Sequence, residues 1–551
     1  MASCTVSLPS DPARLKRMVL ALQAENADLR VYADLLRLMI FGAKSEKMAA
    51  LDPAQIALDL GDLSDIATTG PAAANDDAPG SGGPPRRKPR AASRNMGALP
   101  VHLPRHEEVI EPKNTICPCC NLALHRIGED ISEALDIVPA LLRVIRTIRP
   151  KYACRSCEDG VSQAPARARV MNGGMATTAL VAHVVVAKFG WHLPLYRQAQ
   201  MLAGAGLDID RGTLGGWVTR AAWWLKPLHE RLLGFIRAQP RVFCDETPLP
   251  RLDPGRGRTK VCQLWAQAID DRPWKGPAPP AVGYVFTEGR GTDDLEAQLG
   301  RFGGVLQVDG YGAYKSLAKR RRKSNVAPLR LAFCLAHARR KFADVVKTTG
   351  STEALAVIGT IAEIYLIESR IRGLNAEARL TARKAESAVL MSALKAQLEQ
   401  LMAEVSSKSS IGKAAAYTLG HWQGLTAPSG PPSAFVRSTG SNDRHATGSR
   451  SLDDGRIEVD SNIVERSIKP VCLTRKNALF AGSKRGGESW AILASLVNTA
   501  KLNGIDPELW LADVLERIVS GATPINRLDT LLPWTWKAER EAQRHSEVLA
   551  A

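Results

Sequence analysis

The chain has 551 residues, too many for one hydrophobic core, and a usual size of about 150 residues per domain predicts three or four domains. A hydrophobic content of 45% excludes a wholly disordered protein. The formal net charge of +17 favours an anionic partner, above all nucleic acid, although a merely soluble surface can also be rich in lysine and arginine.

The sequence favours a cytoplasmic location. Its N-terminus lacks the basic and then apolar pattern of a signal sequence. The most apolar internal run, 178–189, is too short to span a bilayer and carries His183 and Lys188. Four of the ten cysteines have a paired metal-ligand spacing, and others are scattered through apolar segments, which suits a reducing compartment. We therefore expect no membrane partner.

Residues 13–41 predict a helix that pairs with a second copy of the chain. Two sets of positions recur every seven residues: Leu15, Leu22, Leu29 and Leu36, with Val19, Asn26, Ala33 and Ile40 between them. This heptad pattern is typical of a coiled coil, and a polar residue at one core position favours a single register in a parallel dimer. The alternative is an amphipathic helix that packs on its own domain. We assign 1–50 to a dimerisation helix.

Residues 51–100 predict a flexible linker with a basic patch. From about residue 66 to 99 the chain is rich in alanine, glycine and proline, and the sequence PPRRKPR occupies 84–90. The patch could touch phosphate, but a solvated linker explains it better.

Residues 101–165 predict a zinc-binding domain. Cys117 and Cys120 form one C-x-x-C knuckle, and Cys154 and Cys157 form another after 33 intervening residues. Four thiolates of this kind bind a structural, tetrahedral Zn²⁺ that leaves no open position for chemistry. Cys119 could replace Cys120, although its spacing is less suitable, and the alternative to a zinc site is a set of reduced free thiols.

Residues 170–238 predict a helical segment that resembles a helix-turn-helix unit. The expected helices are 178–189, 195–203 and 213–235. A role in reading DNA is a weak hypothesis, because short patterns of this kind are common in helical domains. We expect the tryptophans of the last helix to be core residues rather than base-stacking groups: Trp217, Trp223 and Trp224.

Residues 239–505 predict an α/β catalytic domain, followed by a helical tail at 506–551. The expected strands are 241–245, 261–269, 281–287, 304–309 and 329–334. Three strands in succession followed by helix-linked strands is the order of a ribonuclease-H-like fold. The helical stretch 350–425 is an insertion in this domain, and the chain is helical again from 462 to 515.

Three acidic residues of this domain form a candidate metal site. Asp245 and Asp309 each stand where a short apolar run ends, so strands would hold both carboxylates at the rim of a sheet. Glu465 lies in a helical stretch. Two carboxylates from neighbouring strands and one from a helix can bind two Mg²⁺ ions for phosphoryl transfer. Any one of them alone would be read as a surface or capping acid, and Glu246 and Asp460 are the acids most easily mistaken for members of the set.

Motifs along most of the chain resemble those of insertion sequence 66 family transposases. The first half contributes FGAKSEK at 41–47, the paired C-x-x-C with RPKYAC at 149–154, and LPLYR at 193–197. The second half contributes DETP at 245–248, DGY at 309–311, CLAHARRKF at 334–342, ER at 465–466, RKN at 475–477, FAG at 480–482 and LLPW at 531–534. Two departures are the serine in Asp460-Ser-Asn462, where the family usually has asparagine, and Lys469, where it usually has arginine.

The resemblance implies a DDE transposase with a ribonuclease-H-like core, whose triad maps onto Asp245, Asp309 and Glu465. It implies binding to terminal inverted repeats and target DNA, cleavage that frees a 3′ hydroxyl, and strand transfer, with two Mg²⁺ or Mn²⁺ ions and a structural Zn²⁺ as cofactors. Small accessory proteins of the same element could also be partners. We expect two basic groups to contact phosphates: Arg339, Arg340 and Lys341, and then Arg466, Lys469, Arg475, Lys476, Lys484 and Arg485.

Two further features need an interpretation. Cys334 and His337 share a strand-to-helix junction, but two ligands are too few for a second metal site, so packing and a phosphate contact are expected there. The glycine-rich turn 482–487 has no P-loop pattern, so we expect no nucleoside triphosphate cofactor.

Two other functions remain open at this point. One is a dimeric, zinc-containing DNA-binding regulator, an inactive relative of a transposase. The other is a structure-selective nuclease of the same fold, which would cut DNA junctions without joining ends. The intact triad argues against the first, and the dimerisation and zinc modules argue against the second.

Overall fold

The computed structural model describes residues 151–153, 161–163, 168–171, 174–324, 326–426 and 450–550. The described residues from 168 onward form one compact unit, and strands β1 (Lys151–Ala153) and β2 (Val161–Gln163) belong to another. β1 and β2 pair in antiparallel fashion, with Lys151 opposite Gln163. The predicted coiled coil, the linker and all four cysteines of the predicted zinc site lie outside the described residues.

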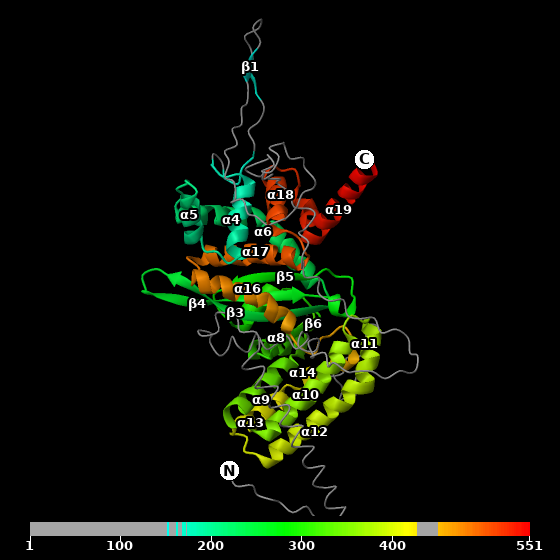
Figure 1. The fold of residues 1–551 in the computed structure, drawn as a ribbon. Coiled ribbons are helices and arrows are strands. Elements are labelled where there is room, and N and C mark those ends of the chain that lie inside the picture. The colour runs from blue at the N-terminus through cyan, green and yellow to red at the C-terminus, as the bar shows by residue number, and fades with distance from the viewer. Residues whose placement is uncertain are drawn as a thin grey trace, which may run out of the picture. The chain divides into compact units, whose positions relative to one another are not determined.

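A five-stranded sheet lies at the centre of the larger unit, in the order β5-β4-β3-β6-β7 (Figure 1). Its strands are β3 (Arg241–Asp253), β4 (Arg258–Ile269), β5 (Ala281–Thr287), β6 (Val305–Val308) and β7 (Arg330–Phe333). The first three are antiparallel neighbours, and β6 and β7 run parallel to β3. Helix α7 (Thr292–Leu299) connects β5 to β6, and helix α8 (Gly312–Arg322) connects β6 to β7. The five predicted strands and the mixed α/β class are confirmed.

Strand β3 is much longer than the sequence predicts, and two prolines explain the error. Pro248 and Pro250 lack an N–H group, so a run that contains them does not read as a central strand. β6 pairs only with residues 241–243, which leaves the later part of β3 without a strand on that side. The carbonyl of Pro250 accepts a hydrogen bond there from the N–H of Ala481 (2.8 Å), so the proline rings replace no N–H that β4 would need.

Helices cover the sheet (Figure 1). α16 (Asn462–Ala478) contacts β3 and β4, and α17 (Lys484–Leu502) contacts β5. Side-chain hydroxyl groups of α17 accept hydrogen bonds from the backbone of β5. The N–H of Val282 donates to Thr499 (3.1 Å), and the N–H of Tyr284 donates to Ser495 (2.7 Å). The remaining helices of this layer are α4 (Thr178–Phe189), α5 (Leu195–Gly204), α6 (Arg211–Arg237), α18 (Pro507–Val519), η4 (Ile525–Leu531) and α19 (Pro533–Ala550).

The predicted segment 170–238 contains its three helices, but they serve largely as core. Most of α4 is buried, against α6, α17 and α18. Trp217 is buried as expected, and Trp224 is half-buried, with its indole N–H donating to the carbonyl of Val170 (3.0 Å). The expectation is wrong for Trp223, whose side chain is 57% exposed with the Arg220 guanidinium 4.5 Å from its ring centroid.

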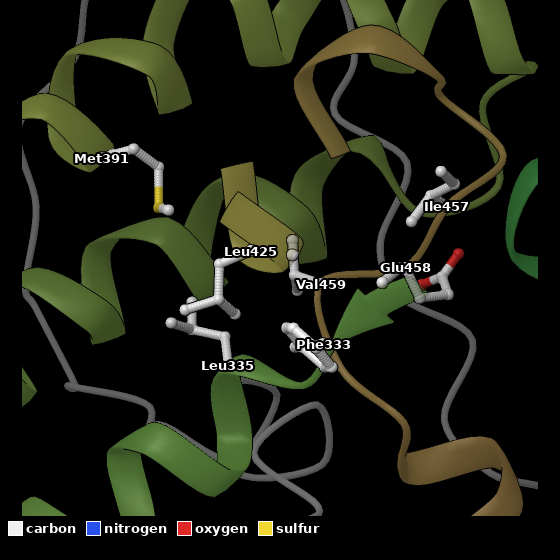
Figure 2. Close-up of a pocket in the computed structure, with 9 residues that line it drawn as sticks. Phe333, Leu335, Met391, Leu425, Ile457, Glu458 and Val459 are labelled. Carbon is white, nitrogen blue, oxygen red and sulfur yellow. The ribbon is translucent and has the colours of Figure 1, made fainter. Parts of the chain in front are cut away.

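The predicted insertion is a set of helices with a hydrophobic core of its own. It follows β7 and comprises α9 (Leu335–Thr349), α10 (Thr352–Ile371), α11 (Ala376–Ala382), a π-helical turn η3 (Arg383–Ser387), α12 (Ala388–Glu404), α13 (Ser410–Gly420) and α14 (Trp422–Thr426). A short helix, α15 (Arg450–Asp453), then leads toward α16. Figure 2 shows the apolar seam where Phe333 and Leu335 meet Leu425 of the insertion and Val459 of the segment before α16.

Buried ion pairs join the insertion to that same segment. Arg379 and Arg383 are at most 1% exposed, and both contact the carboxylate of Glu368. Arg379 also contacts Glu458 (2.8 Å), and Arg383 donates to the carbonyl of Ile457 (2.7 Å). Since residues 457 and 458 lie just before α16, the insertion helps to set where α16 begins.

Among the helices that the structure describes, none is both long enough and apolar enough to cross a membrane.

Candidate active site

Three separate elements supply the predicted acids. Asp245 lies within β3, Asp309 directly follows β6, and Glu465 lies in the first turn of α16. The register of β3 and β6 pairs Phe243 with Gln307, so continuing it by two residues brings Asp245 opposite Asp309. The start of a helix is a favourable place for a carboxylate, because its backbone N–H groups carry partial positive charge. The fold thus brings together two strand acids and one helix acid.

The electrostatics of Asp245 show that these acids lie near one another. Burial above all, together with the charges of Glu246, Asp309 and Glu465, raises the pKa of Asp245 to about 8, although a hydrogen bond from the N–H of Glu246 acts in the opposite direction. Repulsion among carboxylates destabilises the ionised centre unless a cation offsets it. Carboxylate oxygens are the ligands that hard divalent cations prefer, so these residues fit a Mg²⁺ or Mn²⁺ site.

The loop that carries Asp309 is held from two sides. Within the loop, the backbone N–H of Tyr311 donates a hydrogen bond to the Asp309 carboxylate (2.8 Å). Tyr417, from α13 of the insertion, donates its hydroxyl to the backbone carbonyl of Asp309 (2.9 Å). Gly310 has φ +99°, and a Cβ there would lie 2.7 Å from the ring of His421, so both conformation and space require glycine. The insertion therefore positions the second acid.

Glu465 has several polar neighbours. It is 7% exposed, and its Oε1 lies 3.4 Å from the hydroxyl of Ser461 and 3.5 Å from Nδ1 of His337. Arg340 approaches Oε2 at 3.4 Å. Cys334 is also close, since its sulfur, the carboxylate and a His337 nitrogen all lie within 4.8 Å of one another. The structure thus adds a third metal-ligating group to the pair that the sequence associates with packing.

Two neighbouring acids have other partners. Glu246 forms an ion pair with Arg290, and the hydroxyl of Tyr314 donates to it (3.0 Å). Asp460 accepts hydrogen bonds from both the backbone and the side chain of Asn462 (3.1 and 3.0 Å) at the start of α16. Burial raises the pKa of Asp460 to about 6. Both neighbouring acids therefore have hydrogen-bond or ion-pair partners of their own within the protein.

A cavity of about 300 Å³ adjoins the second acid. It is lined by Asp309, Gly310, Tyr311, His337, Arg340, Lys341, Asp344 and Tyr417. Lys341 is exposed, with its ammonium 4.3 Å from the ring centroid of Tyr417. Cationic side chains and one of the three acids therefore line the same cavity. This arrangement suits a phosphate group that must approach the carboxylates.

The predicted phosphate-binding residues fall into two groups. Arg339, Arg340 and Lys341 lie on α9, and of these Arg340 and Lys341 line the cavity. Most of the second group is exposed, along α16 and at the start of α17: Arg466, Lys469, Lys476, Lys484 and Arg485. Arg475 differs, because its guanidinium donates to the hydroxyl of Thr247 (2.9 Å) and to the carbonyl of Pro248. Arg475 thereby fastens α16 to β3, a contact that its position in the sequence does not reveal.

The sequence did not reveal two contacts near the acids: that of Tyr417 with Asp309 and that of Arg290 with Glu246. Tyr417 lies in a stretch whose Ala/Leu/Lys composition indicates only helix, and nothing in its spacing connects it with Asp309. Arg290 follows β5 and also lies over the ring of Tyr311, with its guanidinium 3.9 Å from the ring centroid. Only the tertiary fold brings these side chains to the acids.

A mixed α/β protein with clustered carboxylates beside an exposed basic surface belongs to a class that handles polyanions with the help of cations. Comparison with protein families defines the class further. The family model described as "Transposase IS66 family" matches residues 173–428 and 439–489, and the model described as "IS66 C-terminal element" matches residues 495–534. Earlier in the chain, "zinc-finger binding domain of transposase IS66" matches 114–158, and "Transposase C of IS166 homeodomain" matches 28–107.

The chain belongs to the IS66 transposase family. It is therefore a DDE transposase with DNA-binding and zinc-finger regions, and the resemblance seen in the sequence is confirmed. The first match spans the sheet, the insertion and the start of α17, so it includes all three acids.

Three relatives come from Sinorhizobium fredii, and their names state no activity. The uncharacterized protein y4jD is 61% identical over 97% of this chain and 98% of its own length. The uncharacterized protein y4qI is 41% identical over 82% of this chain and 79% of its own. The uncharacterized protein y4hP is 34% identical over 80% and 76%.

Proposed function

We propose that this transposase binds the terminal inverted repeats of its insertion sequence and catalyses metal-dependent DNA cleavage and strand transfer at Asp245, Asp309 and Glu465. The observation that carries the proposal is the convergence of these acids from β3, β6 and α16, expressed in the raised pKa of Asp245.

We further propose that the core is ribonuclease-H-like. Three antiparallel strands come first in the chain, and two parallel strands are then added beside the first of them. The two aspartates stand on adjacent central strands, and the glutamate comes from a helix packed on the sheet. The helical insertion lies between the second and third acids in the chain.

The chain's own residues would bind and align the reactants. Asp245, Asp309 and Glu465 would hold two Mg²⁺ or Mn²⁺ ions, which supply activation of an attacking oxygen and stabilisation of a leaving one when bound. Lys341 and Arg340 would bind the phosphate beside the scissile bond, because they line the cavity next to Asp309. Water then breaks the phosphodiester to give a 3′ hydroxyl, which attacks the target strand and displaces a 3′ oxygen there. No covalent enzyme intermediate is required.

The exposed basic residues of α16 and α17 would bind the DNA backbone. Lys469, Lys476, Lys484 and Arg485 carry charges that the fold leaves at the surface. Each phosphate contact that is lost should weaken binding to all sequences alike and reduce its dependence on salt. Arg475→Ala, in contrast, should lower stability, because its guanidinium is used within the protein.

The N-terminal modules are proposed to complete the assembly. A structural Zn²⁺ at Cys117, Cys120, Cys154 and Cys157 would fold the domain that binds DNA. The heptad helix would pair two copies, so that two transposon ends can be held together. Small accessory proteins of the same element are proposed as further partners.

A cleavage assay tests the proposal. The full-length protein is incubated with Mg²⁺ and labelled DNA carrying the terminal repeats that flank its gene, beside the Glu465→Gln variant. The matched control is Glu488→Gln, which removes the charge of an exposed glutamate on the neighbouring helix α17. We expect cleavage at the repeat ends by wild type and Glu488→Gln but not by Glu465→Gln.

The other outcomes discriminate the remaining functions. Binding to the repeats without cleavage by any of the proteins, with or without the element's companion proteins, contradicts the enzyme and supports a DNA-binding regulator. Cleavage of branched DNA in preference to the repeat ends, without any joined product, supports a structure-selective nuclease.

A further inference from the structure

Cys334, His337 and Glu465 form a cluster of three different metal-ligating groups. Cys334 directly follows β7 and is the N-cap residue of α9. His337 lies three residues later, in the first turn of α9, and on the same side of the helix as Cys334. Glu465 comes from the first turn of α16, far along the chain. One ligand atom from each residue lies within 4.8 Å of those from the other two.

The atoms of this cluster are poorly satisfied by the protein. Nδ1 of His337 is buried and has no hydrogen-bond partner, since its separation of 3.5 Å from Glu465 Oε1 is too long for a good hydrogen bond. Cys334 is 3% exposed, and its sulfur accepts a hydrogen bond from the N–H of Ser461 (3.2 Å). A buried nitrogen without a partner is costly, and a bound cation would satisfy it together with the sulfur and the carboxylate.

We propose that Cys334, His337 and Glu465 bind a Zn²⁺ ion at a site separate from the predicted Cys4 centre, and that this site has Glu465 in common with the proposed Mg²⁺ site. The donor set of sulfur, nitrogen and oxygen selects a borderline transition metal such as Zn²⁺ or Co²⁺ rather than Mg²⁺, which prefers oxygen alone. Three protein ligands leave the fourth tetrahedral position open to water. Binding converts the Cys334 thiol into a thiolate and releases its proton to solvent.

Occupation of this site has a consequence for the active site. Glu465 belongs to both proposed ligand sets, because it lies beside Cys334 and His337 and is also the third acid of the proposed Mg²⁺ site. A Zn²⁺ ion that holds the carboxylate against Cys334 and His337 withdraws it from Asp245 and Asp309. Arg340, which is 3.4 Å from Oε2 and 31% exposed, must move toward solvent to admit the second cation. Zinc therefore inhibits strand cleavage, and this consequence, unlike the binding itself, rests on the proposed function.

The binding test uses Co²⁺ alone as the probe and the full-length protein without DNA. Thiolate-to-cobalt charge-transfer absorption is titrated in wild type, Cys334→Ser and His337→Gln. The matched control is Cys262→Ser, which removes a buried free cysteine of β4 outside the cluster. The predicted Cys4 centre contributes equally to all four proteins, so differences between them report the new site.

We expect wild type and Cys262→Ser to bind about one more Co²⁺ per chain than the two cluster variants, in keeping with one added tetrahedral site. Cys334→Ser should also lack the part of the thiolate absorption that Cys334 contributes, while the absorption of the Cys4 centre remains. Equal stoichiometry and equal spectra in all four proteins would overturn the proposal. His337→Gln keeps the test decisive if Cys334→Ser fails to fold, because His337 is only partly buried.

A second experiment tests the inhibitory consequence. Zn²⁺ is titrated into the cleavage reaction at constant Mg²⁺, and each protein is normalised to its own rate without zinc. We expect the half-inhibiting Zn²⁺ concentration to rise about tenfold or more in His337→Gln, which corresponds to about 1.4 kcal/mol or more of lost binding. Identical inhibition of wild type and variant would refute the inhibitory role. A lack of cleavage by every protein without zinc would count against the proposed function instead, and the cobalt result would stand.

Discussion

The sheet and the helical insertion both hold the acidic centre, but by different means. Around the sheet, strands and helices share one apolar core, in which Phe243 and Leu306 of the two acid-bearing strands are fully buried. The insertion has a separate apolar core, and polar contacts join it to the Asp309 loop and to the segment before α16. These are the hydrogen bond from Tyr417 to Asp309, the ion pair of Arg379 with Glu458, and the hydrogen bond from Arg383 to the carbonyl of Ile457.

The difference has a physical consequence for the centre. Apolar packing is not directional, so the sheet fixes where Asp245 and Asp309 lie without specifying the helix that completes the site. Ion pairs and hydrogen bonds have fixed geometry, and those of the insertion act on the residues directly before α16. Gln307 of β6 adds a further polar contact, since its side chain donates to the carbonyl of Glu458 (2.9 Å). Polar contacts therefore align Glu465 with an apolar scaffold.

The largest expected effect comes from neutralising an acid of the sheet. Asp245→Asn should reduce strand cleavage by roughly 10³-fold or more, as expected when a ligand of catalytic ions is lost. The same change should raise the melting temperature of the metal-free protein by a few degrees. The reason is that the folded protein raises the pKa of this carboxyl to about 8, so ionisation disfavours folding near neutral pH.

Mg²⁺ provides the check on that prediction. Thermal unfolding with and without Mg²⁺ should show a stabilised wild type and an Asp245→Asn variant that hardly responds. A wild type that is indifferent to Mg²⁺ and Mn²⁺ at millimolar concentrations would break the link between these acids and a cation.

The next largest effect concerns the charges that attach the insertion. Arg383→Met should lower the free energy of unfolding by about 3–5 kcal/mol, because it leaves the carboxylate of Glu368 buried with one fewer partner. Arg370→Met is the matched control, since the Arg370–Glu386 pair lies on the same insertion with both side chains exposed. It should change stability by less than about 1 kcal/mol. Urea unfolding measures both, and equal effects would contradict a role for burial.

In the region around the sheet, we expect the stability of the fold to depend on pH. His229 of α6 is buried and donates its Nε2–H to the carbonyl of Tyr284 (3.0 Å), and burial lowers its pKa to about 4. The unfolded chain therefore binds the extra proton between about pH 6.5 and pH 4, and stability falls as the pH falls through that range.

The size of this pH effect follows from the shift. From about pH 7.5 to about pH 5, His229 should remove about 2 kcal/mol of stability. His229→Gln retains an N–H donor but does not titrate, so its free energy of unfolding should vary less over the same interval. Parallel pH profiles of the two proteins would show that His229 does not titrate as described.

The smallest effect is expected at the contact between the insertion and the Asp309 loop. Tyr417→Phe removes one hydrogen bond to a backbone carbonyl and should cost about 1 kcal/mol of stability. If the contact positions Asp309, cleavage should fall more than stability does, while binding to the repeats is kept. Full cleavage activity in Tyr417→Phe would show that the sheet alone suffices to place the second acid.

Patterns within single elements allowed the sheet and the acids to be predicted. Short apolar runs predicted all five strands, and Asp245 and Asp309 are the acids at which two of those runs end, although β3 itself continues to Asp253. Glu465 was assigned to a helix because its stretch lacks strand character, and α16 confirms this. The end of β3 could not be predicted, because the prolines that argue against a strand face a side with no pairing strand.

Contacts between distant parts of the chain were beyond the sequence. Nothing in the spacing of Cys334 and His337 indicates that Glu465 completes their cluster. Arg475 was grouped with the phosphate-binding residues by its charge, although its guanidinium bonds to Thr247 and Pro248. Such roles depend on how elements pack, and neither periodicity nor residue type encodes that.

The central claim is that β3, β6 and α16 together form one divalent-cation site. The most direct test is anomalous scattering from a crystal of the full-length protein soaked in Mn²⁺. The account predicts anomalous density within coordination distance of carboxylate oxygens from Asp245, Asp309 and Glu465. Mn²⁺ bound elsewhere, with the three carboxylates free of it, would contradict the account.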